Sequence, residues 1–70
     1  MMPLTMARPG ETVTIRKITG RDEVRQHLAE LGVVVGEEVT VVSQLGGNMI
    51  LSIKDSRIAL DKEMACRIMI

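Results

Sequence analysis

The chain has 70 residues, of which 46% are apolar and none is aromatic, and its nine basic residues balance its nine acidic ones. A chain of this length forms one domain with a thin core, and the balanced charge leaves no long-range field to attract nucleic acid or anionic lipid. Without aromatic side chains, it also lacks the stacking platforms for single-stranded bases and the lining of grooves that bind proline-rich peptides.

The N-terminal part of the chain predicts a lead-in, a strand and the start of a helix. Residues Met1–Met6 are expected to lie outside the main fold, and Pro9–Gly10 is typical of a turn. The alternation of polar and apolar residues over Thr12–Ile15 indicates a first strand. Thr19 and Asp22 have the spacing of a capping box, in which the hydroxyl binds a free backbone N–H of the first helical turn.

An apolar stripe marks the helix that follows. Its members recur at i, i+3, i+4 and i+7 and should face the core, while the residues between them face water. The stripe consists of Val24, His27, Leu28 and Leu31. Gly32 stands where a helix commonly ends in the left-handed backbone conformation, so we expect the helix to end there.

The C-terminal half predicts a meander of short strands separated by turns. One glycine pair and the sequence Lys-Asp-Ser separate runs rich in β-branched residues, and a short helical turn precedes the last strand. In order, the predicted segments are a turn at 36–37, a strand at 39–42, a hairpin turn at 46–48, strands at 49–53 and 57–60, a helical turn at 61–65 capped by Asp61, and a strand at 66–70.

Five short strands with one inserted helix predict a mainly β protein, a small, partly open barrel formed by residues 1–70 as a single domain. The helix lies between the first and second strands of this plan. It should cover an open end of the barrel with Val24, Leu28 and Leu31, and closure of the sheet would remove its exposed edges.

Two observations bear on location. No apolar run is longer than the three residues Val33–Val35, whereas a membrane-spanning helix needs about twenty, so we expect no membrane insertion. The N-terminal MMPLTMARPGE has neither the basic start nor the apolar stretch of a secretory signal, and Cys66 is the only cysteine. These features favour a cytoplasmic protein.

Four segments together resemble the FeoA domains, which are small SH3-like barrels. They are PGETVTIRKITG, then HLAELGVVVGEEVTVV with its LxxLGxxxG core, then GGNMILSI, and finally RIALDKEMACRIMI. The resemblance implies a non-enzymatic accessory protein of ferrous iron uptake that works with FeoB, a membrane protein with a cytosolic GTPase domain and a pore for Fe(II). A related barrel forms the C-terminal domain of DtxR-like repressors, so an interaction domain in metal-dependent transcriptional regulation is the alternative.

Metal and catalytic sites are not expected. His27 and Cys66 are the only soft ligands, and a tight site normally needs about three or four. Glu37 with Glu38 offers at most weak Fe(II) binding, as a weak Fe(II) chaperone would use, and a solvated turn is the favoured interpretation of this pair. One histidine provides too little for nucleophilic catalysis, so we predict no catalytic residue, no resident metal and no cofactor.

The candidate contact residues are exposed side chains that the core does not need. Arg21 and Arg25 lie one turn apart on the predicted helix, His27 lies at the rim of the apolar stripe, and Arg57 follows a tight turn. For each of them a solvated surface is the simpler interpretation. With FeoB as the partner that the resemblance implies, we expect contacts there. The methionines of the predicted strands and turns are expected to pack inside, and an exposed apolar patch among them would instead favour a weak homo-oligomer or a partner.

Overall fold

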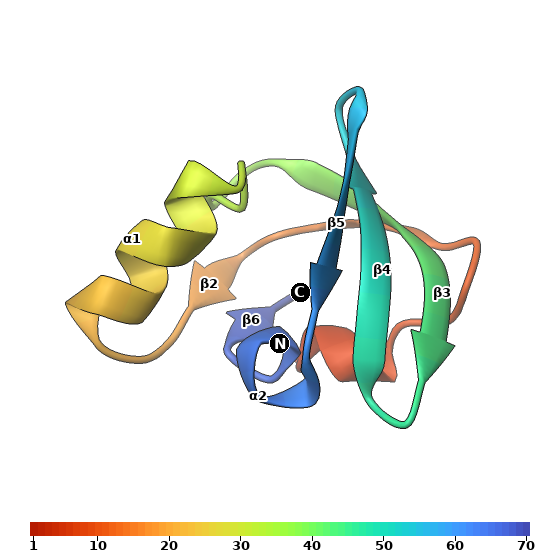
Figure 1. Cartoon of the computed structure of the whole chain (residues 1–70), viewed down its shortest axis with the longest axis horizontal. Helices are drawn as coiled ribbons and strands as arrows, with labels where there is room; N and C mark the ends of the chain where they lie inside the picture. The colour runs from red at the N-terminus through yellow and green to blue at the C-terminus, as the bar shows by residue number, and fades with distance from the viewer.

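The computed structural model describes all residues from Met1 to Ile70 as a small, mainly β fold (Figure 1). Its elements are η1 (Leu4–Met6), β1 (Thr12–Thr14), β2 (Lys17–Ile18), α1 (Asp22–Glu30), β3 (Glu38–Leu45), β4 (Asn48–Ile53), β5 (Ser56–Leu60), α2 (Lys62–Ala65) and β6 (Ile68–Met69). The mainly β class, the inserted helix and the helical turn before the last strand are as expected.

The strands form two antiparallel sheets, and this corrects the expected strand plan. One sheet has the order β1-β3-β4-β5, and the other pairs β2 with β6. The chain changes sheets directly after the predicted first strand, because the Ile15 N–H donates to Glu37 O at 2.9 Å while the Arg16 N–H donates to Met69 O at 2.8 Å, and the second sheet takes up Lys17–Ile18, where no strand was predicted. There are therefore six strands rather than five, and α1 lies between β2 and β3.

The larger sheet does not close. Its outer strands are β1 and β5, and neither pairs with the other or with the smaller sheet. The expectation that closure removes the exposed edges was therefore wrong. In Figure 1 the sheet curls from β3 through β4 to β5, while α1, β2 and β6 lie on the other side of β5.

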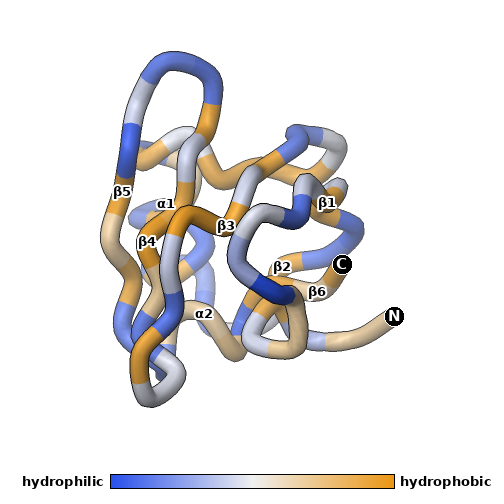
Figure 2. The backbone as a smooth tube through the Cα atoms, turned by 90° about the vertical axis from the view of Figure 1, so that its right-hand side faces the viewer, coloured by the Kyte–Doolittle hydropathy of each residue, from blue (hydrophilic) through white to orange (hydrophobic).

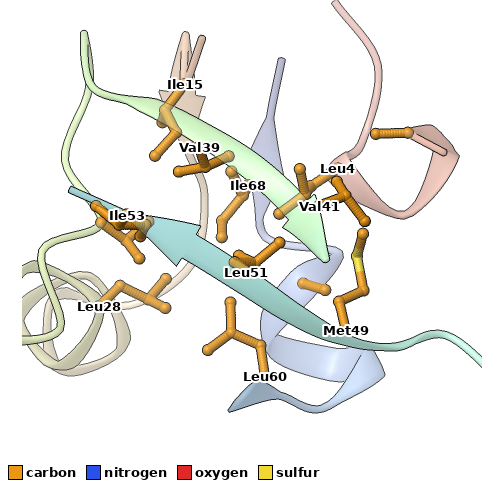
Figure 3. Close-up of a cluster of buried hydrophobic side chains, with 13 residues drawn as sticks. Leu4, Ile15, Leu28, Val39, Val41, Met49, Leu51, Ile53, Leu60 and Ile68 are labelled. Carbon is orange, nitrogen blue, oxygen red and sulfur yellow. The ribbon is translucent and has the colours of Figure 1, made fainter. Parts of the chain in front are cut away.

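Helix α1 is held by one buried side chain and by its C-terminal cap. Leu28 is fully buried, and Figure 3 shows it pointing toward β4 beside Ile53. Gly32 adopts φ +91° as predicted, and its N–H donates to Ala29 O at 2.9 Å. The Val33 N–H donates to Leu28 O at 2.9 Å, which completes a Schellman motif. Leu28 and Val33 then enter the same core.

The predicted capping box at Thr19 was wrong. The N-cap of α1 is Arg21, and no side chain caps the helix there. Instead, the Thr19 N–H donates to Arg67 O at 2.7 Å, and its hydroxyl donates to the same oxygen at 3.3 Å. Thr19 is therefore held against the C-terminal segment, and Gly20, at φ +113°, separates it from the helix.

The N-terminal segment belongs to the core, which the lead-in expectation missed. Leu4 and Ala7 are buried beside the strand residues, and the Met2 N–H donates to Ile70 O at 3.1 Å. In Figure 3, Leu4 lies at the end of the cluster where Val41 of β3 is found. Figure 2 shows the two termini on the same side of the molecule. The core is wholly apolar and consists of Leu4, Ala7, Ile15, Leu28, Val33, Val39, Val41, Met49, Leu51, Ile53, Leu60, Ala65 and Ile68.

The predicted hairpins are confirmed. Gly46 and Gly47, at φ +59° and +90°, connect β3 to β4, as expected of a two-residue turn in which both central residues have positive φ. The β4–β5 turn uses Lys54 at φ +54°, a conformation that the sequence did not indicate. In Figure 2 this turn is hydrophilic, whereas β3 and β4 are largely hydrophobic.

Removing the cap of α2 should have a moderate effect. Asp61 is its N-cap as predicted, because the Oδ1 atom accepts a hydrogen bond from the Met64 N–H at 2.9 Å. We expect Asp61→Ala to lower the free energy of unfolding by about 1 kcal/mol, since that N–H loses its partner. Urea denaturation measures the loss. Asp61→Asn, which can still accept the bond, is the matched control, and an equal loss in both variants would contradict the cap assignment.

Candidate functional site

The most marked surface feature is a cleft between the start of α1 and α2. Two adjoining hollows of about 470 and 540 Å³ share Glu63 and Arg67 as common walls. Thr19, Lys62 and Cys66 line the first, and the second extends to the N-terminal end of α1. The cleft is polar and open, with positive and negative side chains on both walls.

Arg67 is the central side chain of this cleft. The backbone pairing of Thr19 with Arg67 brings the two walls together. Gly20 packs beside the arginine, because a Cβ at that position would be in ordinary van der Waals contact with it, 3.4 Å from its Cδ and 3.7 Å from its Nε. Its guanidinium lies 4.0 Å from Glu63, a long ion pair between partly exposed groups that contributes little to stability.

The structure places the predicted contact residues on two separate elements. Arg21 forms part of the cleft wall, and Arg25 lies one turn further along α1, where its N–H donates to Arg21 O at 3.1 Å. His27 is exposed near the C-terminal end of α1. Arg57 is exposed on β5 and does not line the cleft. Only the two helix arginines are therefore neighbours.

Sequence reasoning missed Arg67 and Lys62 as members of a site. Both follow β5 along the chain, whereas Thr19 and Arg21 precede or begin α1. The separation of Thr19 and Arg67 by 48 positions means that no local motif connects them. The only sequence signal for this site was Gly20 before the helix. Without knowledge of the neighbouring Arg67, a glycine at that position indicates only a turn.

The side chains form no metal centre. No group of three His, Cys, Asp or Glu side chains converges anywhere in the chain. The Glu37 carboxylate lies 3.5 Å from Lys54 Nζ, so one of the two adjacent glutamates already has a cationic neighbour. Cys66 is exposed, and His27 projects from a different element.

No helix has both the length and the apolar composition needed to cross a membrane.

Comparison with known proteins identifies relatives over the full chain. A model of the FeoA domain matches residues 2–70. The putative Fe(2+) transport protein A of Methanocaldococcus jannaschii is 34% identical over 70 residues, which are 100% of this chain and 85% of that protein. The crystal structure of FeoA from Stenotrophomonas maltophilia complexed with zinc, a prokaryotic SH3 domain protein, matches with a TM-score of 0.83 and 27% identity, over 99% of this chain and 88% of the other.

A third similarity concerns the fold alone. A manganese-dependent transcriptional repressor in complex with manganese superposes with a TM-score of 0.88 at 19% identity. The match covers 96% of this chain but only 34% of the repressor. The SH3-like fold expected from the sequence is thus confirmed, and it is shared by proteins with different roles.

Proposed function

Since this chain belongs to the FeoA domain family and is therefore a ferrous iron transport protein, we propose that it binds the cytosolic region of FeoB and modulates that transporter. The family membership expected from the sequence is confirmed, and with it a non-enzymatic accessory role. In this proposal residues 1–70 act as one cytoplasmic unit, and Fe(II) is the cargo of the partner rather than a ligand of this chain.

The observation that carries the proposal is the pair of exposed arginines at α1 that form no ion pair. The chain contains two ion pairs, Lys54 with Glu37 and Arg67 with Glu63. Arg21 and Arg25 take part in neither, and both are exposed. Arginine side chains that are not neutralised within their own chain are suited to an acidic surface, because the guanidinium binds carboxylates in a bidentate fashion.

Apolar side chains are also exposed beyond the C-terminal end of α1. Val34 and Val35, which follow the C-terminal cap of the helix, expose 39% and 62% of their surface. Interfaces commonly combine an apolar centre with arginine at its margin. We assign Arg21 and Arg25 as the principal contacts with FeoB. His27 and Arg57, the other two contact residues predicted from the sequence, are assigned as secondary contacts.

Charge reversal on α1 should weaken the complex. We expect Arg21→Glu with Arg25→Glu to raise the dissociation constant for the FeoB cytosolic domain by about tenfold or more, roughly 1.4 kcal/mol. Titration of the ¹⁵N-labelled chain with that domain measures the affinity and locates the contact face. GTP hydrolysis by FeoB with and without the chain then reports the direction of modulation.

A matched control tests whether position or net charge matters. Arg8 is exposed and follows η1, the N-terminal turn that lies across the molecule from α1 in Figure 1. Arg25→Glu alone, which changes the net charge as much as Arg8→Glu does, should weaken binding, whereas Arg8→Glu should leave it unchanged. Equal effects would exclude α1 as the contact, and a titration without any shift or heat would exclude FeoB binding altogether.

A further inference from the structure

The outer edge of β5 carries backbone groups without partners. Its register with β4 pairs Ile53 with Ser56 across a two-residue turn, so these two residues form the first hydrogen-bonded pair. The backbone groups alternate in direction along the strand. The N–H and C=O groups of Ile58 therefore face β4, and those of Arg57 and Ala59 face away from it. Arg57 and Ala59 make no hydrogen bond outside the strand ladders, and both are exposed.

The usual protections of an edge strand are absent from β5. Between Ser56 and Leu60 there is no proline, glycine or lysine, and Arg57 is the only charged residue. The one irregularity of the sheet lies between Val41 and Ser43, inside the β3–β4 pair, and does not disturb β5. The other edge strand, β1, has only three residues. An added strand would therefore pair with β5.

We propose that this added strand is β5 of a second copy of the chain, paired antiparallel across a two-fold axis at Ala59. This register pairs outward-facing residues with outward-facing residues, as an antiparallel ladder requires. Ala59 lies opposite its own copy at the axis, where its small side chain permits close approach. Arg57 then lies opposite Asp61 of the second copy, and symmetry repeats the pair.

The charges of Arg57 on β5 and of Asp61, which follows the strand and caps α2, complement one another only in this arrangement. Arg57 has no ion pair within its own chain, and Asp61 is exposed, with extended backbone at φ −76° and ψ 170°. An axis at Arg57 would place two guanidinium groups opposite each other, which destabilises a strand pair. An axis at Ile58 would place Asp61 of one copy opposite Asp55 of the other, which brings two negative charges together. The net charge of zero adds no general repulsion between copies.

The interface consists of one strand per copy, so the dimer is weak and forms at high protein concentration. Such small contacts bury far less surface than the roughly 1,600 Å² of a standard interface. The expected observation is a sedimentation coefficient that rises with concentration up to about 1 mM. Raising the salt concentration should shift the equilibrium toward monomer, because the two Arg57–Asp61 pairs are exposed to solvent.

Two lysine variants separate edge pairing from general charge effects. Ser43 pairs with Ile50, and Ile50 pairs with Ala59, so Ser43 and Ala59 lie in one row on the same exposed face. Ala59→Lys brings two ammonium groups together at the axis and should lower the association constant by about tenfold or more. Ser43→Lys adds the same charge on an inner strand and should not.

Cross-linking gives an independent readout of the register. Directly opposed residues of a hydrogen-bonded pair have Cα atoms about 5.5 Å apart, a distance that a disulfide spans. With Cys66→Ser to remove the exposed native thiol, Ala59→Cys should form a covalent dimer on mild oxidation, and Ser43→Cys should not. Thermal unfolding of each variant shows that the monomer remains folded.

The results are independent of FeoB, because every measurement uses this chain alone. Concentration-dependent association that is lost in Ala59→Lys and kept in Ser43→Lys supports the proposal. No association up to about 1 mM, equal losses in the two lysine variants, or cross-linking at Ser43 as readily as at Ala59 would each overturn it. Failure of the FeoB titration would leave the dimer unaffected, so the two proposals are separable.

Discussion

Replacing Leu28 with alanine should lower the free energy of unfolding by about 2–5 kcal/mol. Leu28 has no exposed surface and is the one fully buried side chain of α1. The helix has nine residues, fewer than the roughly 12–15 that an isolated helix needs to be marginally stable. Its stability therefore depends on this contact and on the Gly32 cap.

The loss is large relative to what so small a domain has available. Folded domains have roughly 5–15 kcal/mol of stability, and a thin core places this chain at the lower end. Urea denaturation of Leu28→Ala measures the change, with Gln26→Ala, an exposed position on the same helix, expected to change stability by at most about 0.5 kcal/mol. Similar midpoints for the two variants would show that α1 does not depend on its buried leucine.

The same substitution connects stability to function. Arg21 and Arg25 are presented by α1, and Leu28 is what attaches that helix to the sheet. A helix that detaches in Leu28→Ala would no longer hold the two arginines in place, so FeoB binding should decrease even where the sheet remains folded. The arginine variants should weaken binding without this loss of stability, because both side chains are exposed.

Local features were predictable because their causes lie within a few residues. The spacing of Val24, Leu28 and Leu31 predicted α1, and Gly32 predicted its end, since a left-handed residue must follow the last turn. The Gly46–Gly47 hairpin was predictable in the same way, because few residues other than glycine accept positive φ at both positions of the turn.

Features set by distant contacts were not predictable. Leu4 sits in a segment without apolar periodicity, and only the pairing of Met2 with Ile70 brings it into the core. Thr19 has the sequence context of a helix cap, yet its hydroxyl donates a hydrogen bond to Arg67 O, 48 positions away. In both cases a long-range backbone pairing competes with a local preference, and the long-range pairing determines the structure.

The same distinction applies to the candidate site. The sequence identified Arg21 and Arg25 because both lie on one predicted helix, and the structure keeps them adjacent. It did not identify Arg67, whose place opposite Gly20 depends on the β2–β6 pairing. It also predicted closure, and the open sheet is what leaves Arg57 and Ala59 with unpaired backbone groups.

Gly47→Ala should lower the free energy of unfolding by about 2–3 kcal/mol. Part of this cost is backbone strain, because Gly47 has φ +90°, a conformation that L-residues rarely adopt. The rest comes from Lys62, whose Cγ and Cδ would lie 2.8 Å from the new Cβ and whose own Cβ would lie 3.1 Å away. The backbone of Lys62 is held in place, since its N–H donates to Asn48 Oδ1 at 3.0 Å, so its Cβ cannot move away and its outer side-chain atoms must rotate.

Gly46 supplies the matched control for this prediction, because it has φ +59° and nothing within 4 Å of an added Cβ. Gly46→Ala should cost only the backbone strain, about 1 kcal/mol, so urea denaturation should separate the two alanine variants by about the same amount. Lys62→Ala removes the two nearest atoms and should recover part of the loss in a double variant with Gly47→Ala. Equal losses at the two glycines, or no recovery in the double variant, would mean that Lys62 does not pack against the hairpin turn and that α2 is attached to the sheet in another way.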